Sequence, residues 1–70
     1  MTQIYVPLLD EGTDVWRPTS AEHIKDDVYR IAGGAPEDED WKFSRGQLVR
    51  CREQDLSGRR CLVAYESATI

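Results

Sequence analysis

The chain has 70 residues, of which 40% are hydrophobic and 31% are charged, a size and composition that suit one small folded domain and exclude a fully disordered chain. No run approaches the roughly 20 apolar residues that a membrane-spanning helix needs. Thirteen acidic and nine basic residues give a net charge of −4, which disfavours non-specific binding to nucleic acid.

The first half of the chain begins with a predicted strand over residues 3–9, where alternating side chains indicate one buried face. A turn over residues 10–13 follows, because Gly12 tolerates the positive φ of tight hairpin turns. The chain should resume as a strand over residues 15–19. Since Pro18 lacks a backbone donor, we expect this strand to lie at a sheet edge or to contain a bulge.

The middle of the chain is predicted to contain a strand, a turn and a loop. Residues 21–24 fit a continuation of the second strand better than one helical turn, because the acid of a capping box is missing. A polar turn over 25–27 leads into a third strand over 28–32, which is rich in branched and aromatic residues. The acidic stretch 35–40 is typical of a solvated loop, and residues 41–43 of a brief extended segment.

The last part of the chain has the clearest hairpin pattern. Predicted strands over 47–54 and 59–66 flank a turn that contains the pair Ser57 and Gly58. Short strands separated by turn signals, without a convincing helix, predict an all-β domain that is either a small barrel or two packed orthogonal sheets. We expect a small five-stranded antiparallel barrel.

We expect this domain to span residues 1–66, followed by a frayed tail over 67–70. Several runs of the chain together resemble a family of short uncharacterised bacterial proteins with an SH3-like barrel. The most specific run is Leu8-Leu9-Asp10-Glu11-Gly12-Thr13-Asp14-Val15-Trp16-Arg17-Pro18, and the others are residues 4–6, 41–43, 49–51 and 56–58. The resemblance covers nearly the whole chain and implies an SH3-like fold in a bacterial cytosol. It implies no activity, because function has to be argued from a site.

The residue types that usually carry chemistry are sparse. The chain has only two cysteines, Cys51 and Cys61, and one histidine, His23, as thiolate or imidazole ligands for zinc, and no catalytic motif surrounds them. We therefore predict a non-enzymatic protein without a metal or other cofactor. The cysteine usage favours free thiols in a reducing cytoplasm. A three-residue turn in the last hairpin would place both thiols on one face, whereas two or four residues would place them on opposite faces.

Aromatic residues supply the main functional hypothesis. By strand alternation, Tyr5 and Trp16 should meet on the outside of the first hairpin. Tryptophan, tyrosine and arginine are enriched at interaction hot spots, so a protein partner or a second copy is expected to bind there, without a small-molecule substrate. The candidate residues are Tyr5, Trp16, Arg17 and Trp41, rimmed by Asp10, Glu11 and Asp14. This acidic rim would suit a partner with apolar and basic groups. The alternative is that Trp16 or Trp41 closes one end of the barrel.

The competing hypothesis is binding of nucleic acid by the last hairpin. Small barrels often combine aromatic residues with a basic groove, and the candidate residues here are Arg50, Arg52, Arg59 and Arg60. Acids in the same hairpin are available as cross-strand partners for these arginines. We therefore favour a salt-bridged strand surface over a nucleic-acid site.

Overall fold

The computed structural model of the chain describes residues 1–9, 15–34 and 40–69. Within these ranges the secondary structure consists of strands, without a helix, and therefore without a helix that is long and apolar enough to cross a membrane. The strands are β1 (Thr2–Pro7), β2 (Trp16–Lys25), β3 (Val28–Ile31), β4 (Leu48–Leu56) and β5 (Arg59–Ser67). The all-β prediction is confirmed, and residues 21–24 continue the second strand as expected.

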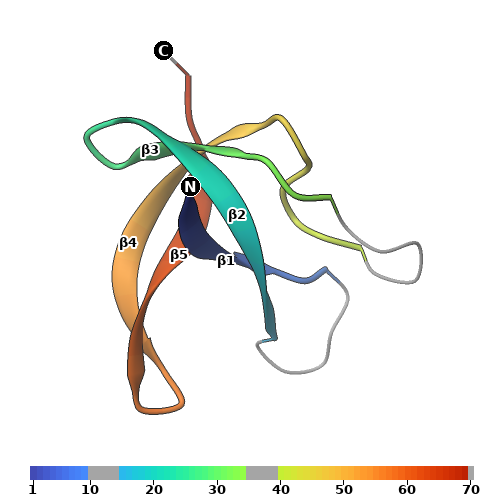
Figure 1. Ribbon diagram of the computed structural model, residues 1–70. Helices are drawn as coiled ribbons and strands as arrows, with labels where there is room; N and C mark the ends of the chain where they lie inside the picture. Colours follow the sequence, from blue (N-terminus) through green and yellow to red (C-terminus); the bar gives the residue numbers. More distant parts are fainter. Residues whose placement is uncertain (10–14, 35–39, 70) are drawn as a thin grey trace.

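The strands follow one another around a closed barrel in chain order (Figure 1). Consecutive strands are antiparallel, but the closing pair of β1 and β5 is parallel, with Tyr5 opposite Val63. A path of five strands that reverses at each turn ends in the direction in which it began, so its first and last strands must point the same way. The five-stranded barrel is confirmed, whereas the fully antiparallel arrangement that we expected is corrected to a mixed one.

The core lines the inside of this barrel. Its main cluster consists of Ile4, Val6, Ala21, Ile31, Phe43, Val49, Cys51 and Ala64, with Tyr29, Trp41 and Leu62 packed against it, and the other buried apolar residues are Val28 and Val63. Among the described residues no polar or charged side chain is buried, so the interior is held together by apolar packing. Phe43 is 3% exposed although it comes from the segment between β3 and β4.

The segment that precedes Phe43 is anchored to the end of β1. Trp41 forms an isolated antiparallel bridge with Leu8, and the Lys42 amide donates to the Pro7 carbonyl at 2.9 Å. Trp41 is thus extended as predicted, whereas the chain bends at residues 42–43. These bonds also place Trp41 and Phe43 where they pack against the core.

The proline in β2 lies where the barrel tolerates it. Strand β3 pairs with β2 only between Ala21 and Lys25. The pairing with β3 therefore ends before Pro18, and the missing backbone N–H of this proline costs that pairing no hydrogen bond. The bulge lies elsewhere, between His23 and Lys25. Next to this region Gly33 packs closely on β2, since a Cβ there would come within 2.1 Å of the Thr19 hydroxyl oxygen.

The turn between β4 and β5 has two residues, Ser57 and Gly58, with φ of 53° and 83°. Two consecutive positive φ values match the tight hairpin turn whose twist suits the flanking strands. This turn places Leu56 opposite Arg59. At the other end of the hairpin, β5 includes Ser67, and the Ala68 amide donates to the Leu48 carbonyl at 2.9 Å, so pairing extends into the stretch predicted as a frayed tail.

Candidate functional site: a groove on the outer wall

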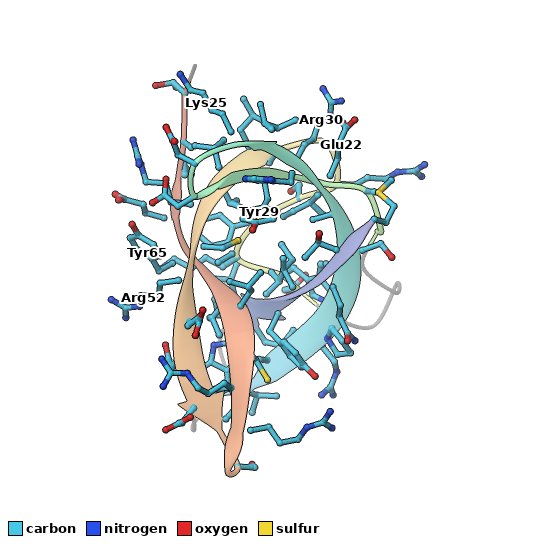
Figure 2. The ribbon with its side chains drawn as sticks, turned by 60° about the vertical axis from the view of Figure 1, so that its left-hand side comes forward. Glu22, Lys25, Tyr29, Arg30, Arg52 and Tyr65 are labelled. Carbon is cyan, nitrogen blue, oxygen red and sulfur yellow. The ribbon has the colours of Figure 1, made fainter. Side chains whose placement is uncertain are left out.

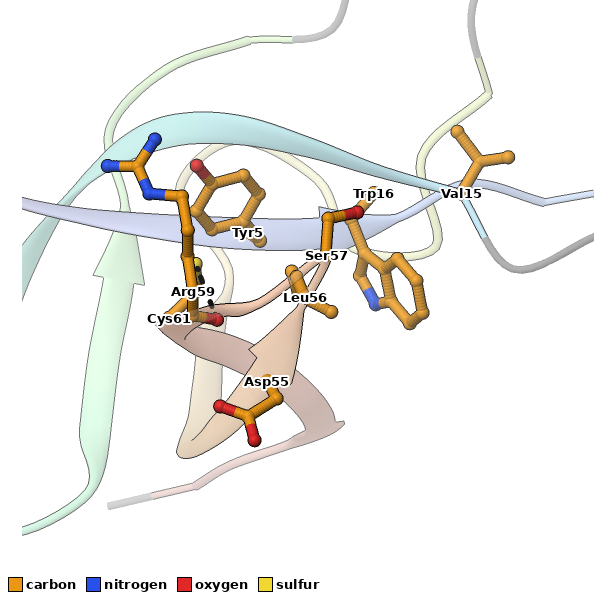
Figure 3. A pocket seen from close by; sticks show the side chains of 8 residues that line it. All are labelled: Tyr5, Val15, Trp16, Asp55, Leu56, Ser57, Arg59 and Cys61. Atoms are coloured by element: carbon orange, nitrogen blue, oxygen red, sulfur yellow. Dashed lines mark hydrogen bonds between the residues drawn. The ribbon is translucent and has the colours of Figure 1, made fainter.

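A concave site of about 470 Å³ lies between the start of β2 and the tip of the β4–β5 hairpin (Figure 3). We call it the outer groove. Its lining residues are Tyr5, Val15, Trp16, Asp55, Leu56, Ser57, Arg59 and Cys61. They come from two ends of the sequence that the closing of the barrel brings together.

One side of the outer groove is formed by β1 and β2. Tyr5 lies between Ile4 and Val6, which are both fully buried, so its own side chain faces the outside of the barrel. In the β1–β2 ladder Tyr5 is opposite Pro18, and Trp16 is two residues further along the same face. The structure therefore brings Tyr5 and Trp16 to one surface, as the sequence predicted.

The other side is formed by the β4–β5 hairpin. Val63 is directly opposite Tyr5 on the same side of the sheet, although Val63 itself is only 3% exposed, and alternation along β5 places Cys61 and Arg59 on that side as well. Leu56 faces Arg59 across the turn and joins them. The parallel pairing of β1 with β5 is registered only at Tyr5 and Val63, and the groove lies where the two strands are no longer paired.

The lining combines an apolar centre with polar ends. Tyr5, Trp16, Leu56 and Cys61 are half-buried, whereas Asp55, Ser57 and Arg59 are exposed. The Cys61 thiol makes a weak hydrogen bond to the Arg59 carbonyl at 3.7 Å, drawn as a dashed line in Figure 3. An apolar cleft with a few polar groups at its margin is the usual form of a binding site.

The remaining predicted partner-binding residues lie elsewhere. Trp41 is half-buried and packs against the core cluster, whereas Trp16 lines the groove. Arg17 is exposed and opposite Val6 in the ladder, and it is not part of the groove lining. The predicted rim of Asp10, Glu11 and Asp14 lies outside the described residues.

Sequence reasoning missed the contribution of the last hairpin to this site. Alternation along β5 and a two-residue turn would have placed Leu56 and Cys61 on one face of the hairpin. No local signal shows that this face meets Tyr5, because that contact depends on the parallel closure of the barrel. The sequence pattern indicates a role for Arg59 only in nucleic-acid binding.

The two cysteines are free and lie on opposite faces of the hairpin. Cys51 is opposite Ala64 in the core, and Cys61 is opposite Gln54 on the outside, as the two-residue turn requires. Burial, together with the negative charge of Asp27, raises the pKa of the Cys51 thiol from 9.0 to about 11. Cys51 is therefore a core residue that stays protonated near neutral pH.

The other arginines of the last hairpin already have partners. Arg50 binds Asp27 at 3.0 Å and approaches Glu66 at 3.9 Å, and Arg60 binds Glu53 at 3.1 Å. These bonds confirm the salt-bridged surface that we favoured. Being exposed, such pairs add little stability, about 0–1 kcal/mol each.

Arg52 and Tyr65, which lie beside each other in Figure 2, form a further contact on this surface. The Arg52 guanidinium carbon is 5.0 Å from the centre of the Tyr65 ring, and the Tyr65 hydroxyl donates to Asp27 at 3.4 Å. On the neighbouring strands Glu22 binds Arg30 in another ion pair. By strand alternation Arg50, Arg52 and Arg59 all face outward, while Arg60 faces the opposite way.

The ring of His23 contacts two residues near the turn between β2 and β3. Its ring stacks on Tyr29 with 4.8 Å between ring centres, and its Nε2 lies 2.7 Å from the Asp26 carbonyl oxygen. Within the described ranges no three histidine, cysteine, aspartate or glutamate residues are grouped as a metal site would require. Comparison with protein-family models, curated proteins and solved structures found no match for this chain.

Proposed function

We propose that this barrel is a non-enzymatic protein-interaction module that holds its partner in the outer groove. The observation that carries the proposal is the joint placement of Tyr5, Trp16 and Leu56 around one concave site. Large aromatic side chains in a partly desolvated pocket dominate the affinity of many protein interfaces. The finer description, an SH3-like barrel of a bacterial cytoplasmic family, rests on the sequence resemblance and is part of this proposal.

The groove is suited to binding because strands hold its walls in place. Tyr5 belongs to a strand whose neighbouring side chains, Ile4 and Val6, are anchored in the core. Trp16 begins β2, and Leu56 is the last residue of β4 before the tight turn. A preformed site loses less conformational entropy on binding than a flexible one does.

The test is to identify proteins that co-purify with the tagged chain from its host, followed by capture of one of them with purified variants. We expect Trp16→Ala and Leu56→Ser to reduce capture at least about tenfold, which corresponds to roughly 1.4 kcal/mol. Leu9→Ala is the matched control, because Leu9 is 45% exposed and does not line the groove. Far-UV circular dichroism checks that each variant is folded. Equal capture by all three folded variants would rule out the groove as the interface.

Binding of single-stranded nucleic acid is the second candidate function. It is supported by the shared outward face of Arg50, Arg52 and Arg59. Its test is a gel shift with single-stranded RNA and DNA at low salt, in which both added salt and the Arg50→Ala, Arg52→Ala double variant should weaken binding. The absence of any shift at low salt would eliminate this candidate.

A further inference from the structure

The outer groove is lined by two charged residues, Arg59 and Asp55. Among the described residues no carboxylate forms an ion pair with this guanidinium, although Arg50 and Arg60 each have one. Asp55 is the acid in the groove lining, but it is opposite Arg60 across the hairpin. In Figure 3 its carboxylate points away from the side of the groove that holds Tyr5 and Trp16. On the side of the groove that holds Tyr5 and Trp16, the charge beside the apolar centre is therefore the positive one of Arg59.

Two of the side chains that line the groove, Trp16 and Arg59, carry donors only. A tryptophan indole offers a single N–H donor, and an arginine offers five donors and no acceptor. Within the described part of the chain, the indole of Trp16 and the guanidinium of Arg59 have no hydrogen-bond acceptor. The chemistry that complements this set is an anionic acceptor next to a large apolar group.

We propose that the outer groove recognises an extended peptide segment of a partner protein in which a large apolar side chain neighbours a carboxylate. The apolar side chain packs between Trp16 and Leu56, and Arg59 binds the carboxylate. This inference rests on the proposed function and names the chemistry of the partner. The partner proposed here is acidic at its contact with the groove, whereas the predicted rim of Asp10, Glu11 and Asp14 suited a partner with basic groups. These three residues lie outside the described residues.

A peptide fits the charge distribution better than a nucleic acid does. Successive phosphates of a single strand need a track of cations along the protein. On this hairpin Arg50 faces Asp27 and Glu66, Arg52 lies over Tyr65, and the whole chain carries a net charge of −4. One arginine without an acidic partner is enough for one carboxylate, which binds guanidinium in a favourable fork geometry.

The direct test is an NMR titration of the ¹⁵N-labelled protein with three probes of one shape. The probes are 4-phenylbutyrate, its uncharged amide and 4-phenylbutylamine. We expect the carboxylate to shift the indole N–H signal of Trp16 and to bind about tenfold more tightly than the amide, because hydrogen bonds to charged groups are the stronger ones. The amine should bind more weakly than the amide.

Two neighbouring arginines provide the matched variants. Arg59→Gln should remove the preference for carboxylate over amide while leaving binding of the amide unchanged. Arg60→Gln should keep the preference, because Arg60 faces the other side of the hairpin and binds Glu53. Both arginines are exposed, so neither change threatens folding.

Several outcomes would overturn the inference. Equal binding of carboxylate and amide, or a preference for the amine, would refute the anionic partner and leave the proposed interaction site intact. A short oligothymidylate that binds more tightly than phenylbutyrate and shifts the amides of Arg50 and Arg52 would favour nucleic acid instead. If no probe shifts the Trp16 indole signal, the inference fails, and the capture experiment with Trp16→Ala decides separately on the proposed function.

Discussion

The inner and outer faces of the barrel wall carry the same residue types in different surroundings. On the inside, Cys51 is 4% exposed in the core and Trp41 packs against that core. On the outside, Cys61 and Trp16 are half-buried and line the groove. The two cysteines therefore differ in access to solvent, whereas the two tryptophans are both half-buried and differ in what they pack against.

This contrast shows that a residue's position along a strand decides whether its side chain faces the core or the solvent. Cys51 and Cys61 lie in the same hairpin, and the two-residue turn at Ser57 and Gly58 decides that they face opposite ways. A register shift of one residue would exchange the faces of a whole strand. The inner face stabilises the fold, and the outer face is left with the groups that we propose for binding.

The largest expected difference between the two faces is in the rate at which their thiols are labelled. At pH 8 a thiol with a pKa of about 11 is ionised in only about one molecule in a thousand, and the thiolate is the form that reacts. We expect Ellman's reagent to modify Cys61 at least about a hundredfold faster than Cys51, whose reaction needs local opening.

Variants with a single cysteine assign the fast and the slow phase of the labelling reaction to Cys61 and Cys51. Cys51→Ala should leave only the fast phase, and Cys61→Ala only the slow one, while both thiols should react rapidly in denaturant. Similar rates for the two thiols in the folded protein would contradict their placement on opposite faces.

The tryptophans should differ next in their effect on stability. Trp41→Ala removes a side chain that packs against the core, and we expect it to lower the free energy of unfolding by about 3 kcal/mol. Trp16→Ala should lower it by less than about 1 kcal/mol, because Trp16 lies outside the core cluster. Urea titration followed by far-UV circular dichroism gives both values. An equal loss for both variants would make Trp16 a structural residue and weaken the proposed binding role.

The buried thiol of Cys51 should make the stability of the protein depend on pH in the alkaline range. Since the pKa of Cys51 rises from 9.0 to about 11 on folding, the unfolded chain loses this proton first as pH increases. Stability is therefore retained below pH 9 and lost between pH 9 and 11, by about 2 kcal/mol from this group. Urea titrations of the wild type and Cys51→Ala over this range isolate the contribution, because other groups titrate equally in both. Parallel curves would show that Cys51 is accessible to solvent.

The smallest effect should come from the turn that sets the two faces. Ser57 has a φ of 53°, a conformation that asparagine adopts more readily than serine does. We expect Ser57→Asn to stabilise the protein by roughly 0.5 kcal/mol and Ser57→Val to destabilise it by roughly 1 kcal/mol. Thermal melts of the two variants provide the measurement. A stabilising valine would mean that the turn does not hold this geometry in solution.

Local patterns predicted the strands better than they predicted the site. Alternation placed Ile4 and Val6 inside and Tyr5 outside, and the serine–glycine pair located the last turn. The same patterns were silent on Trp41, because a short extended segment between two loops has no periodicity long enough to show which side is buried. They were equally silent on Leu56 and Cys61, whose neighbours across the groove are about 50 positions away along the chain.

The amino-acid sequence by itself determined that the domain is all-β, which segments are strands, which side of the first strand is apolar and where the last hairpin turns. These properties depend on neighbouring residues and on a side-chain period of two. Only the tertiary structure decided that β1 and β5 close the barrel in parallel, that Trp41 packs against the core and that Tyr5 and Trp16 meet Leu56 and Arg59. Those contacts join distant segments, and their geometry depends on how all five strands pack around one core.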